Sequence, residues 1–234
     1  MGILSFVLRG GRAALFFIIV SPAVSSSLDE AKRKTYNQNT SSIRRTEMEL
    51  IRQLEQLAPF NEEEARDRDL IIECLRREPD VFTRANALAH MTASAWIVNR
   101  DRTKVLMAYH NLYDSWAWLG GHADGDEDLL RVAMKEAREE SGLANIVPVT
   151  EAIFSAESLP VFGHFKRGVY VPSHTHLNVT YLLQADETEI THIKPDENSG
   201  VKWFALDEAL AAVSEDWMRE HIYEKLNAKL RALI

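Results

Sequence analysis

The chain has 234 residues, of which 46% are hydrophobic and 26% are charged. This composition is typical of a globular protein and excludes the collagen-like, low-complexity and disordered classes. Cys74 is the single cysteine, so no disulfide can form within the chain and a disulfide-built secreted scaffold is excluded. Acidic residues outnumber basic ones by 35 to 27, which gives a net charge of −8, so we expect no stable nucleic-acid partner.

The first 42 residues differ in composition from the rest, and we interpret residues 1–42 as a leader or linker. Two arginines precede an apolar run from Ala13 to Val20, which is far shorter than the roughly 20 residues that span a bilayer. The run resembles the core of a signal peptide, with Ala23 and Ser25 as a cleavage pattern. We expect no membrane span and a cytoplasmic protein. The alternatives are export, an unstructured leader and a mis-assigned start.

Residues 43–84 are predicted to form an N-terminal extension of two amphipathic helices. In the first helix, apolar residues recur at helical spacing from Leu50 to Leu57. The second is predicted to begin after Asn61 as its N-cap, with Glu64 as the capping-box partner, and to end at Pro79. We expect both helices to pack on the following domain, and a separate hairpin that binds a partner is the alternative.

Residues 85–234 are predicted to form one domain of the α/β (α+β) class, because strands and helices follow one another in mixed order. Strands are expected at Met91–Val98, Lys104–Tyr109, Val147–Phe154, Val161–Tyr170 and His174–Leu183. Gly120 and Gly121 are expected to form a turn before a charged helix that ends at Gly142. Two further helices are expected at Leu206–Val213 and Glu215–Leu233.

The charged helix places three glutamates on one edge. On a helical wheel of about 100° per residue, the apolar arc consists of Leu129, Leu130, Ala133, Met134 and Ala137. Glu136 and Glu139 lie at its border and Glu140 lies inside it, whereas the basic residues Arg131, Lys135 and Arg138 face solvent. Carboxylates at this spacing repel one another, and burying one of them unpaired costs on the order of several kcal/mol.

Hard divalent cations prefer oxygen ligands, so this edge suits such a cation, and a glycine carbonyl nearby can add a ligand. A solvated acidic helix face is the alternative interpretation.

The segment from Gly121 to Leu143 resembles the Nudix box, G-x5-E-x7-R-E-U-x-E-E-x-G-U, in which U is a bulky aliphatic residue. The matching positions are Gly121, Glu127, Glu136, Glu139, Glu140, Gly142 and Leu143. Lys135 stands where the family has arginine, and Ala137 is small for the aliphatic position. The resemblance implies an α/β/α sandwich with a mixed sheet over about residues 85–215. It also implies a pyrophosphohydrolase that cleaves a diphosphate linkage in a nucleoside diphosphate derivative or a related small molecule.

The resemblance also implies a catalytic and metal-binding set. Mg²⁺ or Mn²⁺ would be held by Gly121, Glu136, Glu139 and Glu140. These three glutamates and Glu197 are the catalytic candidates, because the general base of this fold is a box glutamate or a distal one. Glu157 is a weaker candidate for the base. Lys135 lacks the planar fork of arginine, so a contact with Glu127 is expected to be less rigid.

Histidines and an aromatic residue are candidates for binding the substrate. His174, His176 and Asn178 alternate along a predicted strand and so share one face, which lines a pocket or faces solvent at a sheet edge. His122 is predicted to approach the substrate phosphates, and Trp118 to stack on a base, with core or rim packing as its alternative. Two histidines at this spacing also fit a zinc site, although no thiolate supports one.

Two other functions stay open at this point. One is a binding or regulatory module with the same fold and no catalysis. The other is an enzyme similar to isopentenyl diphosphate isomerase, which uses an active-site cysteine, whereas Cys74 lies in the N-terminal helices. We expect a small-molecule diphosphate as partner and leave a homodimer open. The substrate is selected by loops outside the box and is not identified by the sequence.

Overall fold

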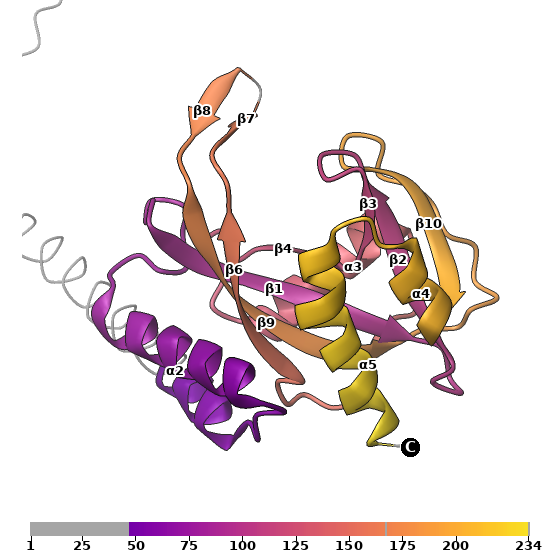
Figure 1. Cartoon of the computed structure of the whole chain (residues 1–234), viewed down its shortest axis with the longest axis horizontal. Coiled ribbons are helices and arrows are strands. Elements are labelled where there is room, and N and C mark those ends of the chain that lie inside the picture. The colour runs from indigo at the N-terminus through magenta and orange to yellow at the C-terminus, as the bar shows by residue number, and fades with distance from the viewer. Residues whose placement is uncertain (1–46, 167, 234) are drawn as a thin grey trace, which may run out of the picture. The chain divides into compact units, whose positions relative to one another are not determined.

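The structure, a computed structural model, describes residues 47–166 and 168–233. The predicted leader, residues 1–42, lies outside the described residues. Figure 1 shows a mixed sheet with helices on both of its faces. The predicted α/β (α+β) class, an α/β/α sandwich around a mixed sheet, is therefore confirmed.

The sheet is built around two parallel strands, β1 (Ala89–Val98) and β9 (His174–Gln184), which pair along their whole length from Ala89 opposite Thr175 to Val98 opposite Gln184. All other pairings are antiparallel, and the main path runs β10-β2-β1-β9-β5. The other strands of this sheet are β2 (Lys104–His110), β3 (Ser115–Ala117), β4 (Leu119–His122), β5 (Val147–Pro148), β6 (Ser155–Val161) and β10 (Asn198–Ala205).

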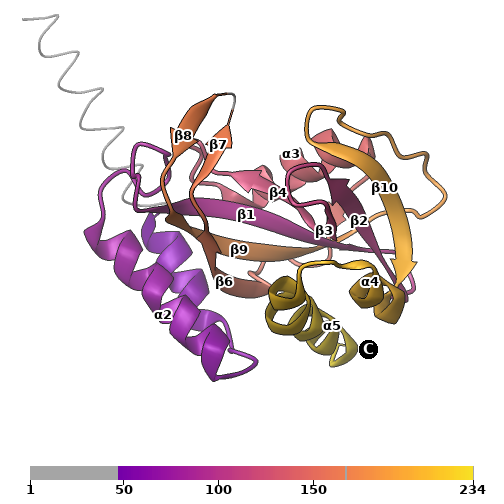
Figure 2. The same cartoon turned by 45° about the horizontal axis from the view of Figure 1, so that its top comes forward.

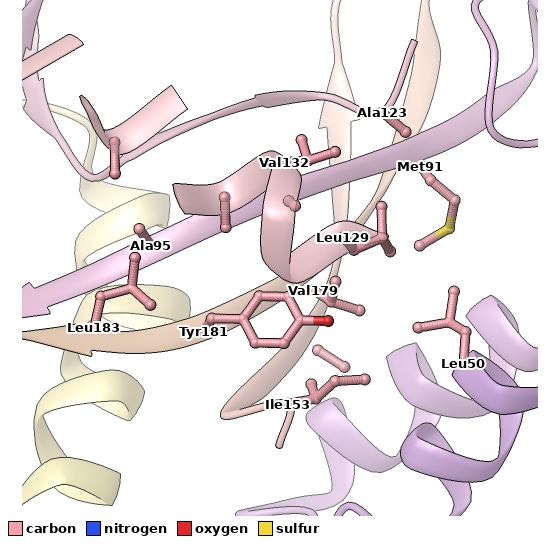
Figure 3. Packing of buried hydrophobic residues seen from close by; sticks show 14 of the residues in the cluster. Leu50, Met91, Ala95, Ala123, Leu129, Val132, Ile153, Val179, Tyr181 and Leu183 are labelled. Carbon is pink, nitrogen blue, oxygen red and sulfur yellow. The ribbon is translucent and has the colours of Figure 1, made fainter. Parts of the chain in front are cut away.

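Two apolar clusters cover the two faces of the sheet, because successive side chains of a strand point to opposite faces. One cluster joins Met91 of β1 and Val179 of β9 to helix α3 (Leu129–Ser141), and Figure 3 shows Leu129 and Val132 lying over these strands. The other joins Trp96 and Val98 of β1 to helix α5 (Glu224–Arg231). The sheet thus holds α3 on one side and α5 on the other.

The N-terminal helices pack on the domain, as predicted. The described part of the first helix is residues 47–56, and α2 spans Glu62–Arg77. Leu54 and Ile71 are fully buried in the same apolar cluster as α3, and α2 lies beside β6 in Figure 2. Asn61 caps α2 by accepting a hydrogen bond from the backbone N–H of Glu64, with 2.8 Å between the nitrogen and Oδ1.

Glu64 has a different role from the capping-box partner that the sequence predicts. Its fully buried carboxylate accepts hydrogen bonds from the Phe60 N–H at 2.5 Å, Ser155 Oγ at 2.7 Å and Lys229 Nζ at 2.6 Å. Although burial opposes ionisation, the Lys229 ammonium and the Phe60 amide hold the pKa of Glu64 below its usual range. This carboxylate therefore links α2 to β6 and α5 through polar bonds within an apolar surround.

Two predicted strands are wrong. In Val147–Phe154 only the first two residues form a strand, and in Val161–Tyr170 the chain leaves β6 and forms a separate hairpin. The hairpin consists of β7 (His164–Lys166) and β8 (Val169–Val171), and it projects from the main sheet in Figures 1 and 2. Strand β6 is not predicted from the sequence because its inward-facing positions include polar residues and so lack the apolar alternation of a half-buried strand.

Three helical segments end the described chain. Helix α4 (Leu206–Ala212) agrees with its predicted range. The second predicted helix contains a π-helical segment, η1 (Met218–Tyr223), that continues into α5. Within residues 47–166 and 168–233, no helix combines the length and apolar character needed to cross a membrane.

The Glu64–Lys229 pair should make a measurable contribution to stability. Lys229→Met leaves the Glu64 carboxylate buried without its cation, so we expect a loss of about 3 kcal/mol in the free energy of unfolding, measured by urea denaturation at pH 7. Arg66→Met, which breaks the exposed Arg66–Glu62 pair, is the control and should leave the midpoint unchanged. Equal losses in the two variants would contradict this role for Lys229.

Candidate active site

Helix α3 ends at Gly142, as the sequence predicts. Asp128 caps it by accepting a hydrogen bond from the Arg131 N–H at 3.0 Å. Gly142 ends it with φ 73°, a left-handed conformation that favours glycine, and donates to the Arg138 carbonyl at 2.8 Å. A Cβ on Gly142 would lie 2.7 Å from Cβ of His192, so glycine is required there for space as well.

Glu140 lies on the buried face of α3 and is 6% exposed. Its Oε2 accepts a hydrogen bond from the Gly120 N–H at 3.1 Å. Burial, together with the negative charges of Glu197 and Glu136, raises the pKa of Glu140 to about 8. The helix therefore carries a carboxyl group that is costly to ionise unless a cation is placed beside it.

Three carboxylates converge at this point. Glu136, Glu140 and Glu197 each offer an oxygen, and these three oxygens lie within 4.8 Å of one another. We call these residues the carboxylate triad. Glu197 reaches it because Asn198, which begins β10, donates from Nδ2 to the Glu140 carbonyl at 2.9 Å. The structure thus brings a distal glutamate and two box glutamates together.

The glycine pair is part of a strand, β4, and not the predicted turn. Gly120 lies opposite Ser94 of β1, and a Cβ on it would lie 2.6 Å from the Ala93 carbonyl oxygen. A Cβ on Gly121 would lie 2.7 Å from Cδ of Glu136. Glycine is therefore needed at both positions, because Gly120 packs against the backbone of β1 and Gly121 packs against Glu136 of the triad.

Two lysines contact the acidic edge of α3. Lys135, whose side chain is 59% exposed as the helical wheel predicts, places its Nζ 3.0 Å from Oε1 of Glu136 and 3.6 Å from Glu139. Lys194 lies 3.0 Å from Glu197 and 3.4 Å from Glu139. Glu139 is therefore held by both lysines, and it lies outside the triad. Four carboxyl groups thus face two ammonium groups, and the edge keeps an excess of negative charge even with Glu140 protonated.

The polar row on β9 faces the interior, and the alternative of a solvent-exposed sheet edge is wrong. Asn178 is fully buried, and its Oδ1 accepts hydrogen bonds from Thr92 and Ser94 at 2.9 Å each. Its Nδ2 donates to Glu157 at 2.8 Å. Glu157 is itself buried beside Lys225 at 3.1 Å, away from the triad. Both side chains are thus engaged in contacts that hold strands together, and the roles predicted for Asn178 in substrate binding and for Glu157 as the weaker base candidate stay predictions.

The structure places Trp118 against Tyr223. The backbone N–H of Trp118 donates to the Tyr223 hydroxyl at 3.3 Å, and the two rings meet edge to face with 5.6 Å between their centroids. The side chain is partly exposed at the boundary of the apolar cluster that includes α5. This position agrees with rim packing, the alternative that the sequence left open for this residue.

The three predicted histidines lie together, and a fourth that the sequence analysis missed joins them. His90 on β1 is directly opposite His176 on β9, with ring centroids 5.2 Å apart, and His122 lies 4.7 Å from His176. Burial, together with the nearby histidine rings, lowers the pKa of His176 to about 2. We call His90, His122, His174 and His176 the histidine cluster.

The comparisons with known proteins concern the part of the chain that carries the carboxylate triad and the histidine cluster. The family model described as the NUDIX domain matches residues 88–226. The comparison with curated proteins finds no match.

Several solved structures are similar to the chain. A binary complex of a C. elegans Ap4A hydrolase is 18% identical, with 61% of this chain and 96% of that chain covered and a TM-score of 0.44. A NUDIX-family hydrolase from Clostridium perfringens is 23% identical, with 62% and 98% covered and a TM-score of 0.45. The NUDIX domain of Shewanella oneidensis NrtR, complexed with ADP ribose, is 18% identical, with 68% and 97% covered and a TM-score of 0.45.

The two glycines of β4 should respond differently to the same substitution. Gly121→Ala meets the end of a flexible side chain, so we expect a folded protein in which the Glu136 carboxylate is displaced and Mn²⁺ binds about 10-fold more weakly. Gly120→Ala meets the backbone of β1 and should cost about 1–3 kcal/mol of stability. Mn²⁺ titration and urea denaturation check both effects. Unchanged Mn²⁺ affinity in Gly121→Ala would count against this packing.

The raised pKa of Glu140 predicts a pH dependence of stability in the cation-free protein. Between the ordinary pKa of 4.5 and about 8 the folded state binds a proton that the unfolded state does not, so stability falls as the pH rises through this range. Glu140→Gln removes this fall and should be the more stable protein at pH 8, by a few kcal/mol at most, since one pKa unit is about 1.4 kcal/mol. Urea denaturation with a chelator from pH 5 to pH 9 measures it, with Glu139→Gln as the control. Parallel profiles for the two variants would refute the prediction.

Proposed function

Because the chain belongs to the NUDIX family, we propose that it is a pyrophosphohydrolase, which cleaves a diphosphate linkage with Mg²⁺ or Mn²⁺ held by carboxylates of α3 and by Glu197, the residue before β10. The substrate we propose is a nucleoside diphosphate derivative or a related small molecule. The observation that supports this proposal is the carboxylate triad, in which three acidic side chains approach within 4.8 Å although like charges repel.

The residues present fit a hard dication. The triad offers only oxygen donors, which Mg²⁺ and Mn²⁺ prefer. Gly121 leaves space beside Glu136 that any side chain would fill, and its own carbonyl adds a candidate ligand. Glu140 is buried, and the Gly120 N–H donates a hydrogen bond to its carboxylate at 3.1 Å, so a cation would relieve the remaining cost of its charge.

We assign Glu136, Glu140 and Glu197 to the cation. When bound, the cation would neutralise charge on the diphosphate oxygens. Lys194 stands next to Glu197 at 3.0 Å and keeps a positive charge at the rim, where it can contact the same oxygens.

Glu139 is the acidic residue that this assignment leaves for proton transfer. Its side chain is 43% exposed and lies outside the triad, so its carboxylate is accessible to water. Lys135 and Lys194 contact its two carboxylate oxygens and fix its orientation. We therefore propose Glu139 as the residue that accepts the proton of the attacking water, in place of Glu197.

The two proposed roles separate in kinetics. Glu136→Gln removes a cation ligand, so the Mg²⁺ concentration needed for half-maximal rate should rise by about 100-fold or more. Glu139→Gln should instead lower kcat by about 100-fold or more at saturating Mg²⁺, without changing that concentration. A panel of nucleoside diphosphate derivatives provides the substrates, and phosphate or nucleotide release is the readout. Glu151→Gln, an exposed glutamate in a loop, is the control.

Two outcomes would overturn the proposal. One is full activity in both Glu136→Gln and Glu139→Gln. The other is the absence of turnover across the panel in a protein that calorimetry shows to bind one of these compounds, which identifies a binding module instead.

A further inference from the structure

Four of the eight histidines of the chain converge at one end of the central strands. His90 and His176 are paired across β1 and β9, and His174 lies two residues before His176 on the same face. His122 ends β4, opposite Thr92 of β1. Three separate strands therefore each place a histidine at this corner of the sheet, and their ring centroids are 4.7–5.2 Å apart.

The hydrogen bonds of two rings fix where their lone pairs are. Nδ1 of His90 lies 3.0 Å from the Asn86 carbonyl oxygen, and Nδ1 of His174 lies 2.8 Å from the Pro172 carbonyl oxygen. A carbonyl only accepts, so both Nδ1 atoms carry the proton and both neutral rings keep a lone pair on Nε2. Histidines that bind metals are oriented in this way, with the second ring nitrogen donating to a carbonyl.

Nε2 of His90 is the atom that this arrangement leaves unexplained. His90 is 4% exposed, and its Nε2 is buried without a hydrogen-bond partner among the described residues. A buried polar atom without a partner is uncommon in native proteins, because it loses its bonds to water and gains none in return. The orphaned lone pair belongs to the ring at the centre of the cluster, which contacts the three others.

The spacing of the nitrogens suits a single ion. One ring nitrogen from each of His90, His122 and His176 lies within 4.8 Å of the other two. Nε2 of His174 and Nε2 of His176 share a hydrogen bond at 3.2 Å, in which the unprotonated Nε2 of His174 accepts, so the lone pair of the neutral His176 ring lies on Nδ1. Nitrogens on a tetrahedral zinc ion, at Zn–N distances of about 2.0–2.1 Å, are about 3.3–3.4 Å apart. Small rotations of the side chains therefore bring three rings to one ion without moving the strands.

We propose that His90, His122 and His176 bind one Zn²⁺ ion, with His174 as the adjoining fourth imidazole. Three histidines are a known zinc ligand set, and nitrogen donors favour zinc over Mg²⁺. The positive charge of Arg84 is neutralised by two bonds to Asp124 at 2.7 and 2.6 Å. This proposal assigns His122 and His176 to a metal instead of the substrate phosphates, and it makes the missing thiolate irrelevant.

The proposed zinc site is distinct from the carboxylate triad. Gly121 faces Glu136 and His122 is the next residue of β4, so the two point to opposite faces of the sheet. One site offers oxygen donors and the other nitrogen donors. The zinc proposal therefore does not rest on the hydrolase activity, and the two can be tested separately.

Zinc content is the first measurement. The full chain is dialysed against a chelator, loaded with ZnCl₂, passed through a desalting column and analysed for metal. We expect one zinc per chain, a rise in melting temperature on loading, and zinc–nitrogen distances of about 2.0–2.1 Å by X-ray absorption. Substitution with Co²⁺ should give the visible absorption of a low-coordinate nitrogen site.

Variants locate the ion. His90→Gln and His176→Gln should each weaken zinc binding by at least about 10-fold, and His122→Asn is a third, less buried variant in case either fails to fold. His164→Gln, which changes a histidine of β7, and Glu136→Gln, which changes the triad, are the controls and should keep one zinc per chain. Circular dichroism in the presence of chelator confirms that each variant is folded.

The proposal is overturned if the loaded protein retains no zinc, or if the three histidine variants retain it as the unsubstituted chain does. Zinc lost in Glu136→Gln but kept in His176→Gln also overturns it, since the ion would then lie at the carboxylates. Loss of zinc in the histidine variants with unchanged Mg²⁺ dependence of hydrolysis supports it, whether or not the proposed activity is found.

Discussion

The hydrogen bond from the Gly120 N–H to the buried carboxylate of Glu140 is the interaction on which the arrangement of the site depends. A carboxylate on the apolar face of a helix requires a donor at close range, and a backbone amide can approach only where the strand lacks a side chain. Strand β4 meets this requirement, because it pairs with β1 and contacts α3. The C-terminal end of α3 is then bonded through the Glu140 carbonyl to Asn198, which brings Glu197 from a distant part of the sequence.

The central sheet separates two kinds of donor chemistry. On the face that packs against α3, the apolar cluster is bordered by carboxylates. On the other face, β1 and β9 carry histidines at one end, then the buried amide of Asn178, and then the apolar residues under α5. Because one strand alternates between the faces, a single-residue shift in the register of β4 would exchange Gly121 and His122 and destroy both groups.

Regular local patterns were sufficient to predict some of the structure. The apolar strands β1, β2 and β9 and the burial of Glu140 follow from periodicity in a short window, and Asn61 at the start of α2 and Gly142 at the end of α3 are recognised by residue type. Strand β4 was missed because glycines show no alternation, and β6 because it buries polar side chains. The convergence of Glu197 on α3 and of His90 on His176 depends on pairings between segments distant in sequence, which no local pattern contains.

The burial of Glu64 has a consequence for how the domain is delimited. The matched family range begins at residue 88, yet Ile71 and Leu75 of α2 belong to the same apolar cluster as the residues of β1. A shortened protein that begins at that boundary would expose this surface to water and deprive Lys229 of its counter-charge. A truncated protein designed from the matched family range alone would therefore lack part of the cooperative folding unit, which extends upstream to include α2.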